Sequence, residues 1–186
     1  KGHKDFAISA DPNMSIKEAV SRRDFTMNSM AKDPLTGEIF DYFGGLEDLQ
    51  NGILKVTDAE KFVEDPLRIL RAVQFIGRMG LMLEDESADL IRKLRPELKY
   101  IPKERFRSEW EKLLLRSQHP SLALKSAMEL GIFHEMNPEV VALARTPQEA
   151  DWHPEGDVWT HTLMTVDKAA EIIKENGITG DDALVV

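Results

Sequence analysis

The stretch from Glu64 to Phe75 combines an acid and several bases at helical spacing. Asp65 and Arg68 are three positions apart, so in a helix they are neighbours on the first turn. A carboxylate only accepts hydrogen bonds at neutral pH, and a guanidinium only donates them. A rigid acceptor beside a rigid donor matches cytosine and adenine, which offer an amino group next to a ring nitrogen. Guanine and uracil would leave groups unpaired, at about 1–3 kcal/mol each.

The same stretch also has a simpler interpretation as an amphipathic helix on the protein surface. Pro66 suits the first turn, and Asp65 can accept hydrogen bonds from the free amides there. Capping and base reading do not exclude each other. The apolar arc expected to pack inward is Ile69, Ala72, Val73, Ile76 and Met79, and the polar arc is Arg68, Arg71, Gln74 and Arg78.

A second charged segment lies upstream, where Arg22 and Arg23 precede Asp24. Asp24 can cap a short helix that carries Phe25, Asn28 and Ser29. Adjacent guanidinium groups match phosphate oxygens and could bind a triphosphate. An arginine pair is also common as plain surface charge, so both interpretations stay open at this point.

Helical patterns dominate the chain, with a small α+β part at its start. A capping box at Ser15 and Glu18 predicts a helix to about Arg22. Further helices are expected at 46–50, 85–94, 103–116 and 120–131, with Leu113–Leu115, Leu122, Leu124, Ala127, Met128 and Leu130 in the core. Strands are expected at 5–10 and 39–43, and a strand at 53–56 should return as the partner of 39–43 in a hairpin-like unit.

Composition limits the classes of function. The chain has 186 residues, no cysteine and a net charge of -9, so disulfides and thiolate ligands are excluded and any nucleic-acid contact must come from local basic patches. There is no signal-like start and no apolar run of about 18 residues, which favours a cytoplasmic protein that is not bound to a membrane. Both ends look cut, which predicts a piece of a longer protein.

Four blocks together resemble the bacterial tRNA nucleotidyltransferase and poly(A) polymerase family, the class II CCA-adding enzymes. Their order and spacing match over about Gly2 to Leu81. Tyr42 departs from the proline often found in the family before the Phe-Gly-Gly turn. The blocks are Arg22-Arg23-Asp24-Phe25-Thr26-x-Asn28, then Asp33-Pro34-x-x-Gly37-x-x-x-Asp41, then Phe43-Gly44-Gly45-x-x-Asp48-Leu49, and Glu64-Asp65-x-x-Arg68-x-x-Arg71-Ala72.

The resemblance implies a function and roles for single residues. Asp65 and Arg68 would act as a protein template for the base of CTP or ATP, and Arg23 would contact the phosphates or sugar. Arg71 would also lie against the nucleotide, whereas Gln74 stands where many relatives carry an arginine. The remaining motif residues, expected to support this site, are Arg22, Asp24, Asn28 and Glu64.

The family's Mg²⁺-binding carboxylate pair does not precede Arg22 here. Because nucleotidyl transfer needs metal ions at the primer hydroxyl and the leaving pyrophosphate, the chain alone should be inactive. The resemblance places the Mg²⁺ ligands upstream in the parent protein. It also implies tRNA as a partner. A group of basic residues in the following helices could contact the tRNA backbone, and a solvated helix surface explains the group equally well. That group comprises Arg92, Lys93, Lys103, Arg105 and Arg107.

The segment Trp152 to Met164 resembles the entry helix of an HD phosphohydrolase domain. There His161 would be the first ligand of a divalent metal, but one histidine cannot hold the ion, so no complete metal site is predicted. The expected domain order is the end of the nucleotidyltransferase head at 1–57, the neck with the base-reading helix at 58–118, a helical body or connector at 119–150 and the start of the HD domain at 151–186.

Several functions share these motifs. The parent protein could add CCA, only CC or only A, or it could be a poly(A) polymerase. It could also be an HD phosphohydrolase with a degenerate RNA-binding transferase half, or a noncatalytic RNA-binding scaffold. The head of the phosphohydrolase would lack the carboxylate pair, and the scaffold would have both sites broken. The oligomeric state is open.

Overall fold

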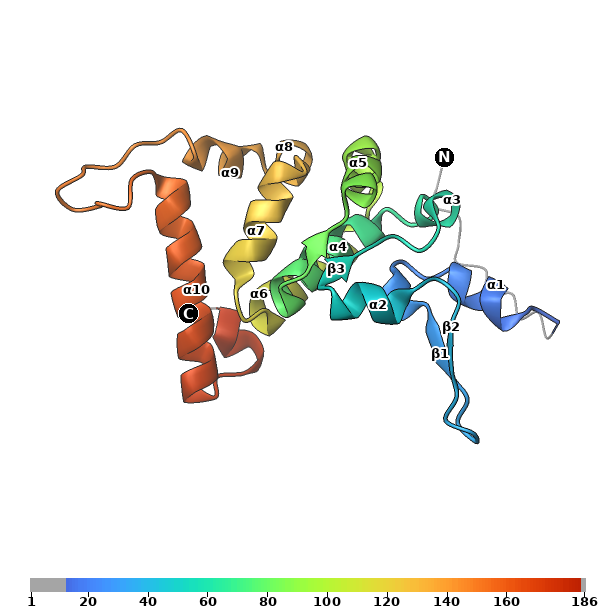
Figure 1. The fold of residues 1–186 in the computed structure, drawn as a ribbon. Coiled ribbons are helices and arrows are strands. Elements are labelled where there is room, and N and C mark those ends of the chain that lie inside the picture. The colour runs from blue at the N-terminus through green and yellow to red at the C-terminus, as the bar shows by residue number, and fades with distance from the viewer. Residues whose placement is uncertain (1–12, 185–186) are drawn as a thin grey trace.

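The computed structural model describes residues 13–184, so the strand expected at 5–10 lies outside the described residues. The chain runs from a small α+β part into an array of helices, as Figure 1 shows from the blue end to the red end. This confirms the mainly helical class with a small α+β part. The elements of the first part are α1 (Ile16–Ser21), a 3₁₀ turn η1 (Thr26–Asn28), β1 (Met30–Lys32), β2 (Ile39–Asp41), α2 (Gly45–Gln50), β3 (Ile53–Leu54) and α3 (Ala59–Phe62).

The second part is helical apart from one short strand. Its central helix α4 packs against α6 and α7, and α7 in turn packs against α10. The elements are α4 (Leu67–Met79), β4 (Met82–Leu83), α5 (Asp85–Leu94), η2 (Arg95–Tyr100), α6 (Lys103–Arg116), α7 (Pro120–Glu129), α8 (Ile132–Met136), α9 (Pro138–Leu143), α10 (Val158–Asn176) and η3 (Gly180–Leu184).

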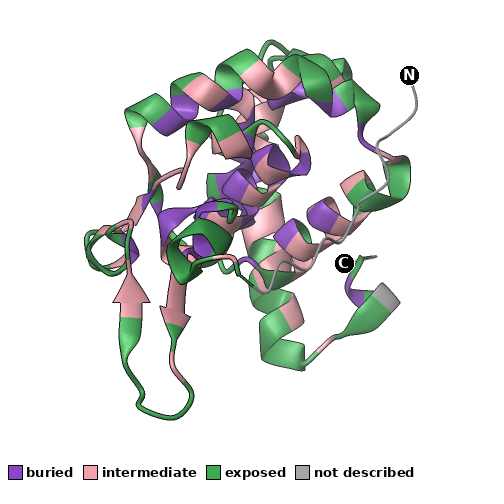
Figure 2. Cartoon of the chain, turned by 90° about the vertical axis from the view of Figure 1, so that its right-hand side faces the viewer, coloured by how far each residue is buried: buried purple, intermediate pink, exposed green. Residues whose placement is uncertain are grey.

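The core follows α4, and Figure 2 shows buried residues gathering along the central helices while the β1–β2 hairpin extends into solvent. Four of the five residues expected on the inward arc are buried, but Met79 is 48% exposed. Met79 is the last residue of α4 before Gly80, where the helix ends and its neighbours no longer cover that arc. Gln74, expected on the polar arc, is only 2% exposed, because α4 also contacts β3 and β4 and is covered on more than one side.

The described strands pair differently from the sequence expectation. β2 pairs with β1 in an antiparallel hairpin, with Met30 opposite Asp41. β3 pairs in parallel with β4, with Leu54 opposite Leu83. The predicted pairing of 39–43 with 53–56 was therefore wrong, because β3 finds its partner across the whole of α4 and a local pattern carries no information on that pairing.

Helix boundaries agree closely with the capping signals. Ser15 Oγ accepts a hydrogen bond from the Glu18 amide at 3.2 Å, and α5 and α6 have the bounds predicted for them. The helix expected after Asp24 is only the 3₁₀ turn η1, whose N-cap residue is Phe25. The core predictions at Leu114 and Leu122 were wrong, since these side chains are 36% and 38% exposed. Across residues 13–184, none of the helices combines the length and apolar composition needed to cross a lipid bilayer.

One backbone contact in the first part leads to a testable prediction. A Cβ atom added to Gly45 would lie 2.2 Å from the carbonyl oxygen of Thr26, so α2 and η1 approach at a distance that only glycine permits. We expect Gly45→Ala to lower the free energy of unfolding by about 1–3 kcal/mol, because the backbone must move apart. Chemical denaturation of the chain measures this change.

Gln50→Ala, on the exposed end of the same helix, is the matched control and should shift stability by less than about 0.5 kcal/mol. Equal stabilities of the Gly45 variant and the native chain would contradict the close approach of α2 to η1.

Candidate functional site

Asp24 joins the first part of the chain to α4. Its side chain is buried, and its Oδ2 accepts a 2.6 Å hydrogen bond from Arg71 Nε. Its Oδ1 accepts hydrogen bonds from the Phe25 amide and from Asn28 Nδ2, both at 3.0 Å. The Arg71 guanidinium also lies 5.2 Å from the centre of the Phe75 ring. Asp24, Asn28 and Arg71, three of the predicted site residues, therefore form one connected cluster.

Arg68 makes a second link between the same elements. Its Nη2 donates to the carbonyl of Arg22 at 2.6 Å, and its Nη1 donates to the carbonyl of Lys61 at 2.8 Å. Arg22 ends α1, and Lys61 belongs to α3. The first turn of α4 is thus held against two segments of the preceding part by a single side chain.

Asp65 lies just before α4 and has two partners. Its Oδ1 accepts a 3.1 Å hydrogen bond from the Leu67 amide, which confirms the expectation that it satisfies an amide of the first turn. Its Oδ2 accepts a 3.0 Å hydrogen bond from Arg105 Nη2 on α6. The carboxylate is 20% exposed, so it is neither sealed in the core nor fully in solvent. Asp65 and Arg68 therefore bind different partners. The arginine that donates a hydrogen bond to the Asp65 carboxylate is Arg105, whereas Arg68 donates to backbone carbonyls.

The other predicted site residues are spread over the surface and the core. Arg23 and Glu64 are exposed next to the clusters above, whereas Gln74 is buried inside α4's packing. The position of Gln74 makes it a core residue in this structure. The exposed Arg23 side chain is accessible to a ligand in solution.

The basic residues assigned to RNA contact are exposed, and several have acidic partners. Arg92 pairs with Asp89 at 2.8 Å and Arg107 with Glu111 at 2.5 Å, each within one helix. Arg105 pairs with Asp65, as described above. Lys93 and Lys103 are exposed on α5 and α6. The RNA-binding role of this group stays a prediction.

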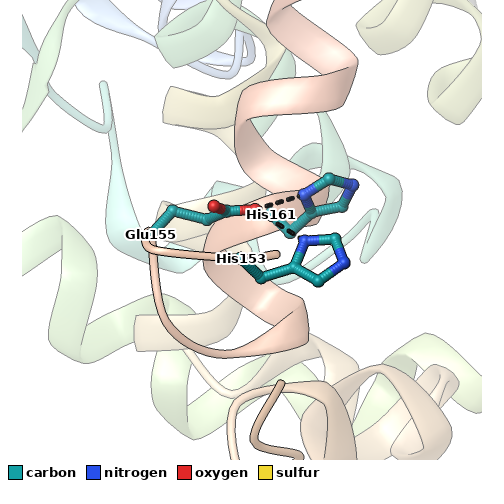
Figure 3. Close-up of side chains that lie close together, drawn as sticks. All are labelled: His153, Glu155 and His161. Carbon is teal, nitrogen blue, oxygen red and sulfur yellow. Dashed lines mark hydrogen bonds and ion pairs between the residues drawn. The ribbon is translucent and has the colours of Figure 1, made fainter. Parts of the chain in front are cut away.

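A third cluster lies at the start of α10, far along the chain from the first two. Glu155 Oε1 lies 2.6 Å from His161 Nδ1 and 3.1 Å from His153 Nδ1 (Figure 3). The backbone amide of Glu155 itself, followed by the two imidazoles, lowers the pKa of its carboxyl to about 2. The carboxylate is therefore ionised at neutral pH and holds both rings.

Sequence reasoning identified His161 but missed His153 and Glu155. The signal was present as a His-x-Glu pair placed shortly before the helix that carries His161. It could not be recognised because the loop from 144 to 157 has no period that would predict how it folds back on α10.

Two family models match the chain. Residues 2–55 match the poly A polymerase head domain, and residues 80–143 match the probable RNA and SrmB-binding site of polymerase A. The acid–arginine helix α4 lies between the two matched segments.

Curated relatives cover nearly the whole chain. The Multifunctional CCA protein of Xanthomonas campestris pv. campestris is 37% identical over 191 residues, which cover 99% of this chain and 46% of that protein. The protein of the same name from Neisseria gonorrhoeae is 39% identical over 174 residues, which cover 92% of this chain and 42% of that protein. The chain therefore spans less than half the length of these relatives.

Solved structures agree with the curated relatives. The Thermotoga maritima CCA-adding enzyme complexed with tRNA matches with a TM-score of 0.61 and 33% identity, over 67% of this chain and 31% of that one. The Bacillus stearothermophilus CCA-adding enzyme in complex with CTP matches with a TM-score of 0.60 and 38% identity, over 63% of this chain and 30% of that one. Motifs, family models, relatives and fold all agree, and the chain belongs to the family of bacterial tRNA nucleotidyltransferases and poly(A) polymerases.

Proposed function

We propose that this chain is the nucleotide-selecting part of a cytoplasmic tRNA nucleotidyltransferase that adds CCA, or part of it, to tRNA 3′ ends from CTP and ATP. The observation that carries the proposal is the fastening of α4 to the preceding part by Arg68 and Arg71. These contacts fix the turn from Asp65 to Arg68 where the α+β part of the chain meets α4. The relatives described above, which are CCA proteins and CCA-adding enzymes, support the same activity.

Base selection would follow from what the two side chains can offer. The Asp65 carboxylate has about four lone-pair sites, and the Leu67 amide and Arg105 use two of them. The remaining sites can accept a hydrogen bond from the amino group of cytosine or adenine. Arg68 has five N–H donors, of which two serve backbone carbonyls. Its others can donate to a ring nitrogen, and the pair would reject uracil and guanine because like groups would then face each other.

Nucleotidyl transfer in this family generally uses divalent metal ions, and the carboxylates around α4 do not fit such a site. Asp24 and Asp65 each hold an arginine rather than facing each other as a ligand pair. We therefore assign the Mg²⁺ ligands to a part of the longer protein outside this chain, and assign to this chain only base selection and positioning of the nucleotide.

We assign the domains as the sequence suggested: the end of the head at 1–57, the neck at 58–118, the body at 119–150 and the start of an HD domain at 151–186. The exposed basic side chains of α5 and α6 would lie along the tRNA backbone, where phosphate contacts position the substrate without reading its sequence. The side chains of Arg92, Lys93, Lys103 and Arg107 are exposed, and Arg92 and Arg107 pair with acidic residues of their own helices, so all four could also contact phosphates in solution.

Poly(A) addition is the second candidate, because one matched family model describes a poly A polymerase head. The two activities differ in the product. Incubating the longer protein with tRNA that lacks its terminal nucleotides, and with each nucleoside triphosphate singly, distinguishes them. Incorporation from both CTP and ATP, stopping after the CCA end, supports the proposal. Long tracts from ATP alone favour the polymerase, and no incorporation from any nucleotide contradicts both.

Arg23 gives a prediction for the phosphate end of the nucleotide. We expect Arg23→Ala in the longer protein to raise KM for both CTP and ATP by a similar factor, on the order of tenfold. An arginine–phosphate contact does not depend on which base the nucleotide carries. Steady-state kinetics with each nucleotide measure the two values.

Lys17→Ala, an exposed cation on α1, is the matched control and should leave both KM values unchanged. An effect of Arg23→Ala on one nucleotide alone would contradict its assignment to the phosphates or sugar.

A further inference from the structure

We propose that the groove between the end of α6 and the second half of α10 binds a phosphate group, carried by a nucleotide or by RNA. In Figure 1 the turn from α6 to α7 lies on the side of these helices that faces α10. None of the residues that line the groove takes part in the contacts of Asp24, Asp65, Arg68 or Arg71. The proposal therefore does not rest on the transferase function.

The groove combines apolar walls with hydrogen-bond donors. Its volume is about 490 Å³, and small-molecule sites typically measure about 300–1,000 Å³. Leucine and isoleucine side chains of α6 and α10 form the apolar part, among them Leu115 and Ile173. The donors come from four exposed side chains, Arg116, Gln118, His119 and Lys174. This lining suits a ligand that carries an anionic group next to a less polar part.

The cations of the groove are not neutralised by the protein. Within residues 13–184, Arg116 and Lys174 form no ion pair and no side-chain hydrogen bond. The acidic residue of the lining is Glu171, whose Oε2 lies 2.7 Å from Lys168 Nζ, so its charge is already matched. The chain as a whole carries a net charge of -9. Two unpaired cations in one groove therefore make a local positive potential that attracts an anion.

The short turn between α6 and α7 adds donors that suit phosphate in particular. The turn carries Gln118 and His119, and their backbone amides donate no hydrogen bond within the described part of the chain. The imidazole of His119 offers at least one N–H group in either tautomer. Guanidinium, ammonium and backbone N–H groups are the usual donors to phosphate oxygens, and each such hydrogen bond is strengthened by the charge of the anion.

The two cations also have a simpler interpretation. Arg116 belongs to the last turn of α6 and Lys174 to the last turn of α10, where positive charge stabilises the end of a helix. This role does not explain His119, which precedes α7 and belongs to neither of these two helices. It also makes a different prediction, because replacing a cation of this kind lowers stability and leaves anion binding unchanged.

NMR titration of the isotope-labelled chain with inorganic phosphate, uridine monophosphate or oligouridylate tests the proposal. Uridine is chosen because the base-reading pair proposed above rejects uracil. We expect the amide resonances of residues 116–119 and 173–178 to shift in a saturable way. Arg116→Gln and Lys174→Gln should each weaken binding by at least about tenfold, because each removes a hydrogen bond to a charged group. Glutamine keeps much of the side chain, and circular dichroism verifies that each variant is folded.

Lys125→Gln is the matched control, an exposed cation on α7 outside the groove, and should bind the probes like the native chain. Tightest binding of uridine monophosphate identifies a nucleotide as the source of the phosphate, and tightest binding of oligouridylate identifies RNA. No shift at these resonances with any probe, or native affinity in both groove variants, would overturn the proposal. None of these outcomes depends on nucleotide incorporation, so this proposal and the transferase function can fail separately.

Discussion

Replacing Asp65 with alanine is expected to reduce the preference for CTP and ATP over UTP and GTP by about 5- to 150-fold, which corresponds to about 1–3 kcal/mol. The reason is the loss of the acceptor that the amino groups of cytosine and adenine would meet. A uracil or guanine carbonyl would no longer face a carboxylate, so the wrong nucleotides gain while the right ones lose. The measurement is kcat/KM of the longer protein for each of the four nucleotides.

The variant also loses a contact at the start of α4. In the native protein the Leu67 amide donates a hydrogen bond to Asp65 Oδ1, as in a helix cap, and losing such a cap costs about 0.5–2 kcal/mol of stability. Asp65→Asn separates the two effects, because its amide oxygen can still accept from Leu67 while its NH₂ group can turn to a carbonyl base. We expect this variant to lose selectivity but no more than about 1 kcal/mol of stability, because the ion pair with Arg105 that it also loses is partly exposed.

Glu60→Ala is the matched control, an exposed acid on α3 a few residues before Asp65. It should leave nucleotide preference unchanged. Unchanged preference in both Asp65 variants would remove Asp65 from the template, and a uniform loss for all four nucleotides would assign it a purely structural role.

The second large effect is expected at Asp24, where Asp24→Ala should lower the free energy of unfolding by about 3 kcal/mol. Removing one partner of a buried ion pair costs about 3–5 kcal/mol, and the lower end applies because the Arg71 side chain is 34% exposed. The Phe25 amide and Asn28 also lose their acceptor. Because Asp24 joins η1 to α4, the loss should loosen the boundary at which Asp65 and Arg68 lie. Urea denaturation of the chain measures the change.

Asp89→Ala provides the comparison, because it breaks a solvent-exposed pair with Arg92 on α5. Such pairs contribute only about 0–1 kcal/mol, so this variant should be nearly as stable as the native chain. A double-mutant cycle of Asp24→Ala with Arg71→Ala should show that the two changes are coupled. Similar costs for Asp24→Ala and Asp89→Ala would contradict the role of Asp24 in joining the two parts.

The helices could be predicted well from the sequence, and the strand pairing could not. α5 and α6 have the predicted bounds because the signals for them are local. Acidic residues at the start of α5 and the prolines at 96 and 102 affect only the backbone of their immediate neighbours. The partner of β3 is β4, which follows α4 in the sequence. Such pairing depends on packing between segments that are distant along the chain. Gln74 was misplaced for the same reason, since only the full set of neighbours buries it.

The candidate site was predicted in part. The sequence identified Asp24, Arg68 and Arg71 as site residues, and the structure joins them into contacts between α4 and the preceding part. It did not predict that Arg105 would reach Asp65, because α6 lies forty positions further along the chain. It also missed His153 and Glu155, which belong to an irregular loop where spacing along the chain says little about spacing in space.

The most direct measurement of the template claim pairs a change in the protein with a change in the nucleotide. The nucleotide analogue is 2-pyrimidinone ribonucleoside triphosphate, which is CTP without its amino group. In the native longer protein, kcat/KM should fall by about 5- to 150-fold from CTP to this analogue. In Asp65→Ala the two should be used almost equally, because the missing acceptor and the missing donor belong to one hydrogen bond. An undiminished preference for CTP over the analogue in Asp65→Ala would contradict the claim that this carboxylate reads the base.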